Sequence, residues 1–348
     1  MTVGCHASGP DTGARGRNDL HTAGSAPERL GSPSPAISLR VRTIQDIAVG
    51  CKLVVLASPD GQPLAAGEPG SHIGLHLPEG VERQYSLLRS QPGADAYEIA
   101  VKRDPSSRGG STFIHDHMQV GDIVLVEPPR NNFPLIEDAG ASVFLAGGIG
   151  ITPILCMIRR LRETGAPWVL HYACRTRIEA AFRDELDGLT NVYFHFDDEH
   201  NGGPFPIREA LSSMPQGAHI YCCGPGSMLA AFVDAAAQAG IDSQLVHVEY
   251  FTQKQEASTE GGFEVELARS GLTVYVAPGR TILQTVLAAG VEMAWSCEEG
   301  FCGACETKVL AGVPDHRDAI LSVREREGSK TMYICCSGCK SERLVLDL

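Results

Sequence analysis

Four cysteines near the C-terminal end of the chain constrain its fold more than any other feature. Cys297, Cys302 and Cys305 follow the spacing C-x4-C-x2-C, and Cys335 comes after a further 29 residues. Cysteines at these intervals are typical of the four thiolates that bind a [2Fe–2S] cluster. Glycines between the first three cysteines allow the loop to bend until the sulfur atoms converge. The sequence therefore predicts a [2Fe–2S] cluster held by these four residues.

Two further cysteines, Cys336 and Cys339, are rival candidates for the fourth ligand. The 29-residue interval favours Cys335 over both. Structural zinc is the alternative metal, but a four-cysteine zinc site usually has a C-x2-C pair in each half. The spacing in this chain therefore favours the cluster.

The motifs around these cysteines resemble those of plant-type ferredoxins. The resemblance is carried by CEEGFCGACETKVL at 297–310 and YICC at 333–336. It implies that residues 263–348 form a β-grasp domain with the cluster on a surface loop.

The length and charge of the chain limit what else it can be. At 348 residues it should hold two or three domains. Its formal charge of −13 argues against nucleic-acid binding, which needs a basic surface, and suits a basic protein partner. We expect no membrane partner either, because the uncharged stretches 139–158 and 210–233 are interrupted by glycine and proline. No signal peptide is evident and cysteine is sparse, which favours a cytoplasmic location.

Changes of pattern along the chain predict its domain organisation. Residues 1–36 are rich in Gly, Ser and Pro and read as a disordered arm. From 37 to 138, short β-like runs are separated by glycine and proline turns, which is typical of an antiparallel barrel. From 139 to 251, strands alternate with helical segments, one of them expected at 180–186, so we expect a parallel α/β sheet. A polar linker at 252–262 then leads to the cysteine-rich domain.

Two segments of the middle domain have a strand, a glycine turn and the start of a helix. They are SVFLAGGIGITP at 142–153 and HIYCCGPGSML at 219–229. Glycine at such a turn lets a pyrophosphate reach backbone N–H groups at the start of the helix. The pair resembles the nicotinamide domain of the ferredoxin-NADP reductase superfamily. The resemblance implies nucleotide contacts from Gly147, Gly148, Gly150, Thr152, Cys223, Gly224 and Pro225, with Cys223 beside the nicotinamide.

The barrel contains a motif that resembles the R-x-Y-S flavin motif of the same superfamily. It is RQYSL at 83–87, and RGGST at 108–112 follows as a second anion-binding turn. The resemblance implies that Arg83 meets the flavin phosphate, that Tyr85 and Ser86 lie against the isoalloxazine, and that Phe251 covers the flavin. The flavin-binding residues expected are Arg83, Tyr85, Ser86, Leu87, Lys102, Gly109, Gly110, Ser111 and Thr112, and those expected to take part in hydride transfer are Ser86, Cys223 and Phe251.

The nucleotide preference stays open. Arg175 and Arg177 follow the strand expected at 168–172, where basic residues accept the 2′-phosphate of NADPH and an acidic residue favours NADH. The two arginines can equally be a solvated pair.

A flavin barrel, a nicotinamide domain and a C-terminal ferredoxin, in this order, resemble the phthalate dioxygenase reductase family. The resemblance implies a protein that carries FMN, takes a hydride from NADH and passes single electrons through the [2Fe–2S] cluster to a Rieske-type terminal oxygenase. We expect the protein to be a monomer. Flavin is suited to this position because it accepts two electrons and releases them singly. The alternatives are a reductase for a diiron or other monooxygenase, and a redox carrier or sensor without steady turnover.

Overall fold

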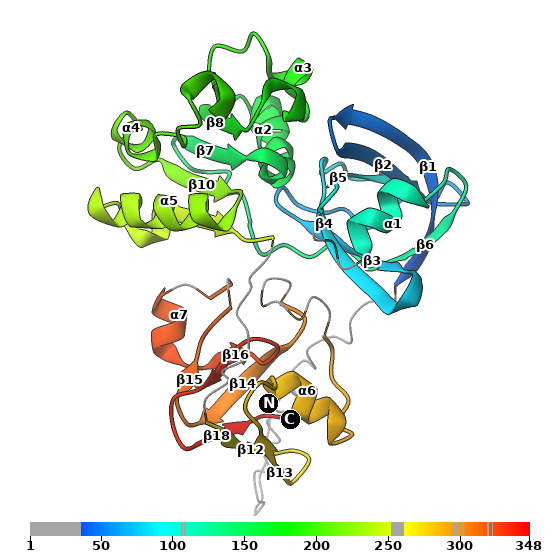
Figure 1. Ribbon diagram of the computed structural model, residues 1–348, viewed down its shortest axis with the longest axis vertical. Coiled ribbons are helices and arrows are strands. Elements are labelled where there is room, and N and C mark those ends of the chain that lie inside the picture. Colours follow the sequence, from blue (N-terminus) through cyan, green and yellow to red (C-terminus); the bar gives the residue numbers. More distant parts are fainter. Residues whose placement is uncertain are drawn as a thin grey trace, which may run out of the picture. The chain divides into compact units, whose positions relative to one another are not determined.

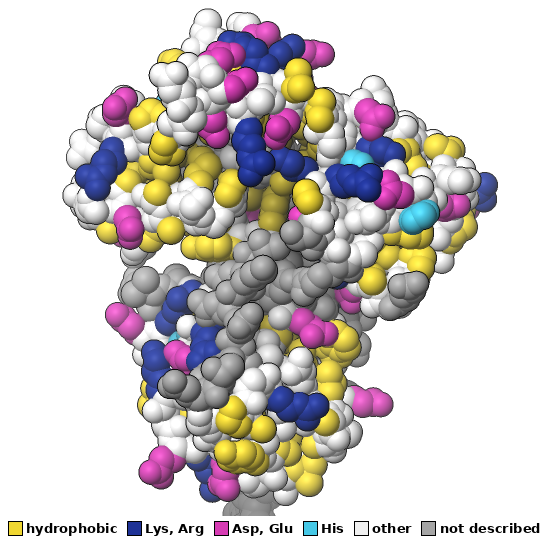
Figure 2. Space-filling model, in the orientation of Figure 1, with side chains coloured by type: hydrophobic (Ala, Val, Ile, Leu, Met, Phe, Trp, Pro, Cys, Tyr) yellow, Lys and Arg dark blue, Asp and Glu magenta, His cyan; other side chains and the backbone are white. Residues whose placement is uncertain are grey.

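The computed structural model describes most of the chain after residue 35. The described residues are 36–105, 107, 109–251, 261–295, 298, 300, 303–318, 320–321 and 323–348. Apart from residues 36, 261 and 262, the predicted arm and linker lie outside them. Within these residues no helix is both long and apolar enough to cross a bilayer. Acidic and basic side chains are intermixed over the face of the described surface in Figure 2.

The first sheet is an antiparallel barrel of six strands. In sheet order they are β4 (Val81–Ser86), β3 (His72–Leu77), β6 (Ile123–Val126), β1 (Ile37–Ala48), β2 (Cys51–Ala57) and β5 (Ala96–Lys102). A bridge between Leu87 and Ile99 joins the two edges of the sheet. Inward-facing residues are buried while their neighbours are exposed, as in β6, where exposed and buried residues alternate. Helix α1 (Gly110–Asp116) lies beside the strands of the barrel (Figure 1). It contributes Ile114 to the barrel core.

The second sheet is parallel and is covered on both faces. Its order is β11 (Val246–Glu249), β10 (His219–Cys223), β7 (Ser142–Gly147), β8 (Trp168–Cys174) and β9 (Val192–Phe196). Alternate residues of β7 enter two different cores: Phe144 packs with α2 (Ile151–Thr164), and Leu145 packs with α4 (Ile207–Ser212) and α5 (Gly226–Gln238). Because both faces are buried, β7 is apolar along almost its whole length.

The helix expected at 180–186 is shorter than the sequence pattern suggested. A 3-10 turn spans Arg177–Glu179, and α3 covers only Arg183–Leu186. Phe182 has a φ of 59°, a left-handed conformation that a continuous α-helix does not allow.

The third sheet is mixed and belongs to the cysteine-rich domain. Its order is β13 (Leu272–Val276), β12 (Phe263–Leu267), β18 (Arg343–Leu346), β14 (Glu306–Ala311) and β16 (Thr331–Tyr333), and a small ladder pairs β15 (Pro314–Asp315) with β17 (Gly338–Cys339). The same domain contains the helices α6 (Ile282–Ala288) and α7 (Val323–Gly328) (Figure 1). The β-barrel, the parallel α/β sheet and the β-grasp domain confirm the fold class expected from the sequence.

Candidate functional site

The two glycine loops meet at one edge of the parallel sheet. The loop after β7 begins at Gly148, and the loop after β10 begins at Gly224. Strands β8 and β9 lie on one side of β7, whereas β10 and β11 lie on the other. The sheet order therefore reverses between β7 and β10, and the crevice outside such a reversal is where open α/β sheets bind their ligands.

Both loops need glycine because their backbones touch. A Cβ atom on Gly150 would overlap the carbonyl group of Cys223 and lie 2.8 Å from the amide nitrogen of Gly224. A Cβ atom on Gly147 would lie 2.7 Å from the Cδ of Pro225. The structure thus brings together the residues of both predicted nucleotide motifs, and side chains at these positions would force the loops apart.

Lys102 lies beside the first glycine loop, although the sequence analysis grouped it with the flavin. Its Nζ is 3.9 Å from the place where a Cβ atom on Gly148 would stand, and it is 3.5 Å from a carboxylate oxygen of Glu179. Gly148 has a φ of 53°, and the hydroxyl of the buried Thr152 donates to the carbonyl of Ile149 at 2.9 Å. Thr152 therefore stabilises the loop, and Lys102 adds a positive charge next to it.

Glu249 is a functional candidate that the sequence analysis missed. It pairs with Cys223 across β10 and β11, and the fully buried thiol donates to its carboxylate over 3.7 Å. Burial raises the pKa of Glu249 to about 8, against a smaller opposing effect of the thiol hydrogen bond. Burial also raises the pKa of Cys223 well above its usual value, with Glu249 adding to the rise. A neutral thiol beside a carboxyl group that titrates near neutral pH can hydrogen-bond a carboxamide.

Phe251, the second of two aromatic residues after β11, is half-buried. Phe251 packs against the core that contains Phe133, Phe144 and Tyr221. Its predicted place over the flavin stays a prediction.

The flavin motif lies on β4, and its arginine reaches the start of α1. A Cβ atom on Gly110 would be 2.5 Å from Cγ and 3.0 Å from Nε of Arg83. Gly109, which precedes the helix, has a φ of 97° and so favours glycine. The structure therefore brings Arg83 together with the second anion-binding turn, as expected for residues that hold one phosphate. Arg108 lies outside the described residues.

The remaining residues of the two flavin motifs include buried side chains. Ser86 and Leu87 are buried, and burial raises the pKa of the Tyr85 phenol, against the opposing charge of Arg83. The hydroxyl of Ser111 accepts from the backbone N–H of Asp104 at 3.1 Å. Ser111 therefore also fixes the approach to α1, while Thr112 lies in its first turn.

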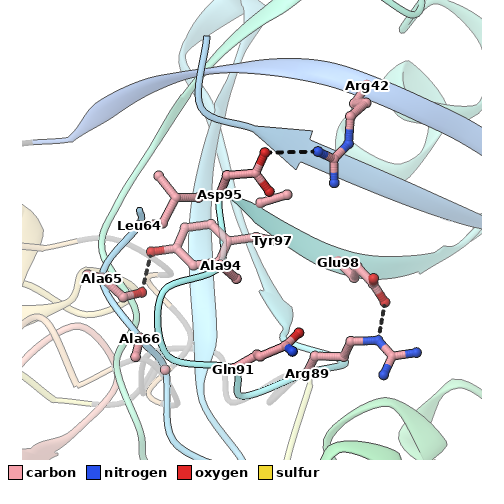
Figure 3. A pocket seen from close by; sticks show the side chains of 12 residues that line it. Arg42, Leu64, Ala65, Ala66, Arg89, Gln91, Ala94, Asp95, Tyr97 and Glu98 are labelled. Atoms are coloured by element: carbon pink, nitrogen blue, oxygen red, sulfur yellow. Dashed lines mark hydrogen bonds and ion pairs between the residues drawn. The ribbon is translucent and has the colours of Figure 1, made fainter. Parts of the chain in front are cut away.

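A small cavity in the barrel is separate from these residues. Its volume is about 110 Å³. Its rim carries the ion pairs Arg42–Asp95 at 3.2 Å and Arg89–Glu98 at 3.0 Å (Figure 3). No residue of the flavin motif lines it. Because the charged side chains of this cavity are already paired and its volume is small, we do not assign it as the flavin site.

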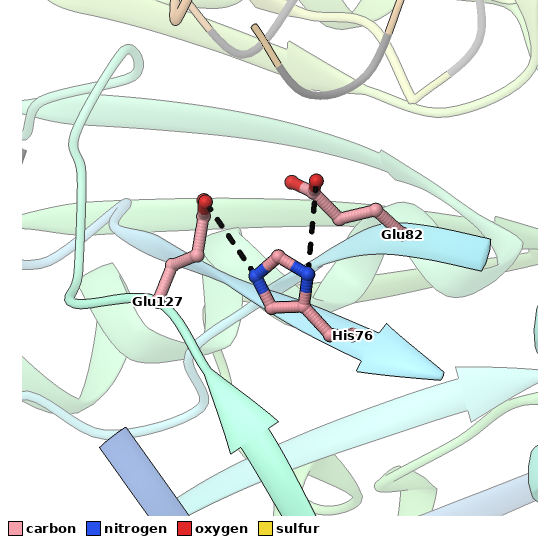
Figure 4. A group of neighbouring side chains, drawn as sticks. All are labelled: His76, Glu82 and Glu127. Atoms are coloured by element: carbon pink, nitrogen blue, oxygen red, sulfur yellow. Dashed lines mark ion pairs between the residues drawn. The ribbon is translucent and has the colours of Figure 1, made fainter. Parts of the chain in front are cut away.

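A histidine between two glutamates lies on the outside of the barrel. The Nδ1 atom of His76 is 4.0 Å from Glu82, and its Nε2 atom is 3.7 Å from Glu127 (Figure 4). Arg130 also approaches Glu127, at 3.3 Å. Each ring nitrogen faces a different carboxylate, and one ligand atom from each of the three residues lies within 4.8 Å of the others.

Two of the four predicted cluster ligands are described. Cys305 immediately precedes β14 and Cys335 follows β16, and because these strands pair antiparallel, both cysteines lie at the same end of the strand pair. Both are buried. Cys297 and Cys302 lie outside the described residues. The buried thiols fit a cluster bound by cysteines.

Two described glycines between Cys297 and Cys305 have backbone conformations that favour glycine. Gly300 has a φ of 75° and Gly303 a φ of 81°. A Cβ atom on Gly300 would overlap the sulfur of Cys336. The rival Cys336 therefore packs against this loop, with its thiol 3.6 Å from the carbonyl oxygen of Tyr333.

Comparisons with known proteins identify two of the domains. The "Oxidoreductase NAD-binding domain" model matches residues 144–234, and the "2Fe-2S iron-sulfur cluster binding domain" model matches residues 265–340. The phenoxybenzoate dioxygenase subunit beta of Ectopseudomonas oleovorans is 49% identical over 90% of this chain and 97% of its own length.

Two solved structures are similar over most of the chain. One is phthalate dioxygenase reductase, described as a modular structure for electron transfer from pyridine nucleotides to [2Fe–2S]. It is 36% identical, with a TM-score of 0.66, over 90% of this chain and 98% of that one. The other is an intact type IV self-sufficient cytochrome P450 monooxygenase, which is 39% identical with a TM-score of 0.81. This chain covers only 41% of that longer protein.

Replacing Gly150 with alanine should disable the nucleotide crevice. The new methyl group would overlap the Cys223 carbonyl, so the two loops must separate. We expect kcat/KM for the nicotinamide nucleotide to fall about 100-fold, because small displacements of a binding site can cost this much. Gly226→Ala is the matched control, since nothing lies within 4 Å of its Cβ position. Equal losses in both variants would contradict this account. The content of bound flavin and the absorption of the cluster show whether each variant is folded.

Glu249→Gln should change how stability depends on pH. The folded-state pKa of about 8 exceeds the ordinary value of 4.5, so the carboxyl contributes stability below about pH 4.5 and loses it as the pH rises through 8. Glutamine does not titrate. The melting temperature of the variant, relative to the parent, should therefore rise between about pH 6 and pH 9. The exposed Glu209, changed to glutamine, serves as a control that should show no such trend, and a flat difference for Glu249→Gln would refute the assignment.

Proposed function

Because the chain belongs to the family of oxygenase reductases related to phthalate dioxygenase reductase, we propose that it passes electrons from NADH through FMN and a [2Fe–2S] cluster to an oxygenase with a Rieske-type centre. It is an oxidoreductase with an NAD-binding domain, a flavin and a [2Fe–2S] domain, and it acts together with an oxygenase component. We further propose that the oxygenase has a Rieske-type centre and that NADH is preferred to NADPH. We also propose that the protein is a monomer and that it is cytoplasmic.

One contact supports hydride transfer between the barrel and the nucleotide domain. Arg159 of α2 donates from Nη1 to the backbone carbonyl of Leu88 at 2.8 Å, and Leu88 is two residues beyond Ser86 of the flavin motif. The same arginine pairs with Glu185 of α3, so it is fixed by both domains. The end of the flavin strand is thereby tied to the helix that starts at the glycine loop.

The roles proposed for individual residues follow from this arrangement. Arg83 and the turn from Gly109 to Thr112 would hold the flavin phosphate, and Tyr85, Ser86 and Leu87 would orient its ring. Bound flavin supplies the chemistry that takes two electrons from a nicotinamide and releases them singly. The nucleotide would be bound by Lys102, Gly147, Gly148, Gly150, Thr152, Arg175, Cys223, Gly224 and Pro225, and the cluster by Cys297, Cys302, Cys305 and Cys335.

The direction of electron flow supports a Rieske-type acceptor. A plant-type cluster near ~−400 mV can reduce a Rieske centre, whose potential lies between ~−150 and +300 mV. The 49% identical relative is named as part of a dioxygenase. The similarity to a cytochrome P450 monooxygenase favours a second candidate, delivery to a haem or other monooxygenase. Anaerobic stopped-flow mixing of the reduced protein with each class of acceptor tests the proposal, and it fails if a monooxygenase is reduced while the Rieske protein is not.

Cys335→Ser and Cys336→Ser should differ in their effects on electron flow. If Cys335 is the fourth ligand, its replacement removes the spin-resonance signal of the reduced cluster and stops delivery to the oxygenase. Flavin reduction by NADH should persist, because the proposed flavin and nucleotide residues all precede 252. Cys336→Ser should retain both the signal and the delivery. The reverse pattern would assign the ligand to Cys336, whose sulfur lies against Gly300.

The bound flavin should be FMN. Arg83 and the start of α1 form one phosphate site, and no further motif is evident in the sequence for an adenosine half. Flavin released by heat and separated by chromatography should be FMN at about one per chain. FAD at that stoichiometry would contradict the prediction.

A further inference from the structure

Two arginines follow β8 at the edge of the nucleotide crevice. Residues at this place in open α/β sheets contact the adenosine ribose, where basic side chains accept the 2′-phosphate of NADPH. By sequence alone, Arg175 and Arg177 are equivalent candidates for this role. The structure gives them different surroundings.

The guanidinium group of Arg177 is already engaged. Its Nε and Nη2 atoms donate to the two carboxylate oxygens of Glu199, with 2.8 Å between Nη2 and Oε2. Its Cζ atom also lies 4.6 Å from the centre of the Phe196 ring. A bidentate ion pair and an aromatic face orient the planar guanidinium group, although the side chains of Arg177 and Glu199 are 56% and 40% exposed. Arg177 therefore presents little of its charge to a ligand.

Glu199 is placed by the loop that follows β9. This loop begins with a 3-10 turn over Asp197–His200, and the backbone N–H of Asp198 donates to the carbonyl of Arg175 at 3.1 Å. The segments after β8 and β9 are thus joined directly. Arg177 holds the pKa of Glu199 below its usual value, so the pair stays charged at neutral pH.

The same loop gives this rim an excess of negative charge. It carries the carboxylates of Asp197, Asp198 and Glu199, against the two guanidinium groups of Arg175 and Arg177. Among the residues that the structure describes, Arg175 has no ion-pair partner, so it is the one arginine left to meet a ligand. A 2′-phosphate carries close to two negative charges. At this rim it would be repelled by these carboxylates, and only the guanidinium group of Arg175 would be available to bind it.

We propose that Glu199, by capturing Arg177, makes the adenosine subsite select nucleotides without a 2′-phosphate. Glu199 is a specificity-determining residue that acts through Arg177 and does not itself need to touch the ligand. The inference rests on the proposed function, because it concerns the same nucleotide crevice. With Arg177 paired to Glu199, the negative charge of the rim favours NADH over NADPH.

Glu199→Gln tests the capture in the full-length holoprotein. Loss of the carboxylate charge should release Arg177, and the ratio of kcat/KM for NADPH to that for NADH should rise about tenfold, the effect of one charge-assisted hydrogen bond. The affinity for 2′,5′-ADP, measured by calorimetry, should rise by a similar factor while that for 5′-ADP is unchanged. Asp197→Asn is the matched control, because it removes one charge from the same loop but not from the pair with Arg177. Equal gains in both variants would show that net charge, and not capture, sets the preference.

Arg177→Ala gives an independent test that does not require the first variant to fold. If Glu199 holds Arg177, the single variant should bind 2′,5′-ADP as tightly as the unaltered protein does. In the double variant, Arg177→Ala should cancel the rise in 2′,5′-ADP affinity that Glu199→Gln produces alone. A fall in 2′,5′-ADP affinity in the single variant would overturn the inference, as would no gain in folded Glu199→Gln. Failure of the proposed function looks different: neither nucleotide would then reduce the flavin of the unaltered protein.

Discussion

The contact between the backbones of two glycine loops is the constraint on which the nucleotide crevice depends. Gly150 lies directly against the Cys223 carbonyl, and Gly147 packs against the Pro225 turn. Neither approach tolerates a Cβ atom, so the crevice can form only if these positions are glycine. The parallel pairing of β7 with β10 brings the two loops level, and the sheet reversal between these strands opens the space above them.

The polar side chains around this crevice take their properties from the same packing. Cys223 and Glu249 end adjacent strands, so the register that aligns the loops also places a thiol beside a carboxyl group. Burial then keeps the thiol protonated and moves the carboxyl titration toward neutral pH. On the other side, Lys102 extends from the barrel to the first loop. The crevice therefore combines groups from both domains, and Arg159 fixes the same two domains at the end of the flavin strand.

Much of this arrangement could be predicted from the sequence, because its signals are local. The glycine turns, RQYSL and the first three cysteines each lie in a short segment, and the fold class followed from them together with the strand and helix patterns. Glu249 and Lys102 show the limit of such reasoning. One acquires its partner through the register of β10 and β11, and the other reaches a loop in the next domain. The short α3 had a similar cause, since the left-handed Phe182 is not evident in the helical pattern.

The two arginines after β8 show why charge counted along a sequence does not determine the charge that a ligand meets. Arg175 and Arg177 are two residues apart, but the loop after β9 captures only Arg177. That loop comes from the next strand of the sheet, so the partner of Arg177 depends on the order β7-β8-β9 and not on its neighbours in sequence. Parallel strands bring successive loops to the same edge. Acidic residues in one loop can therefore neutralise basic residues in the loop beside it, as Glu199 does for Arg177.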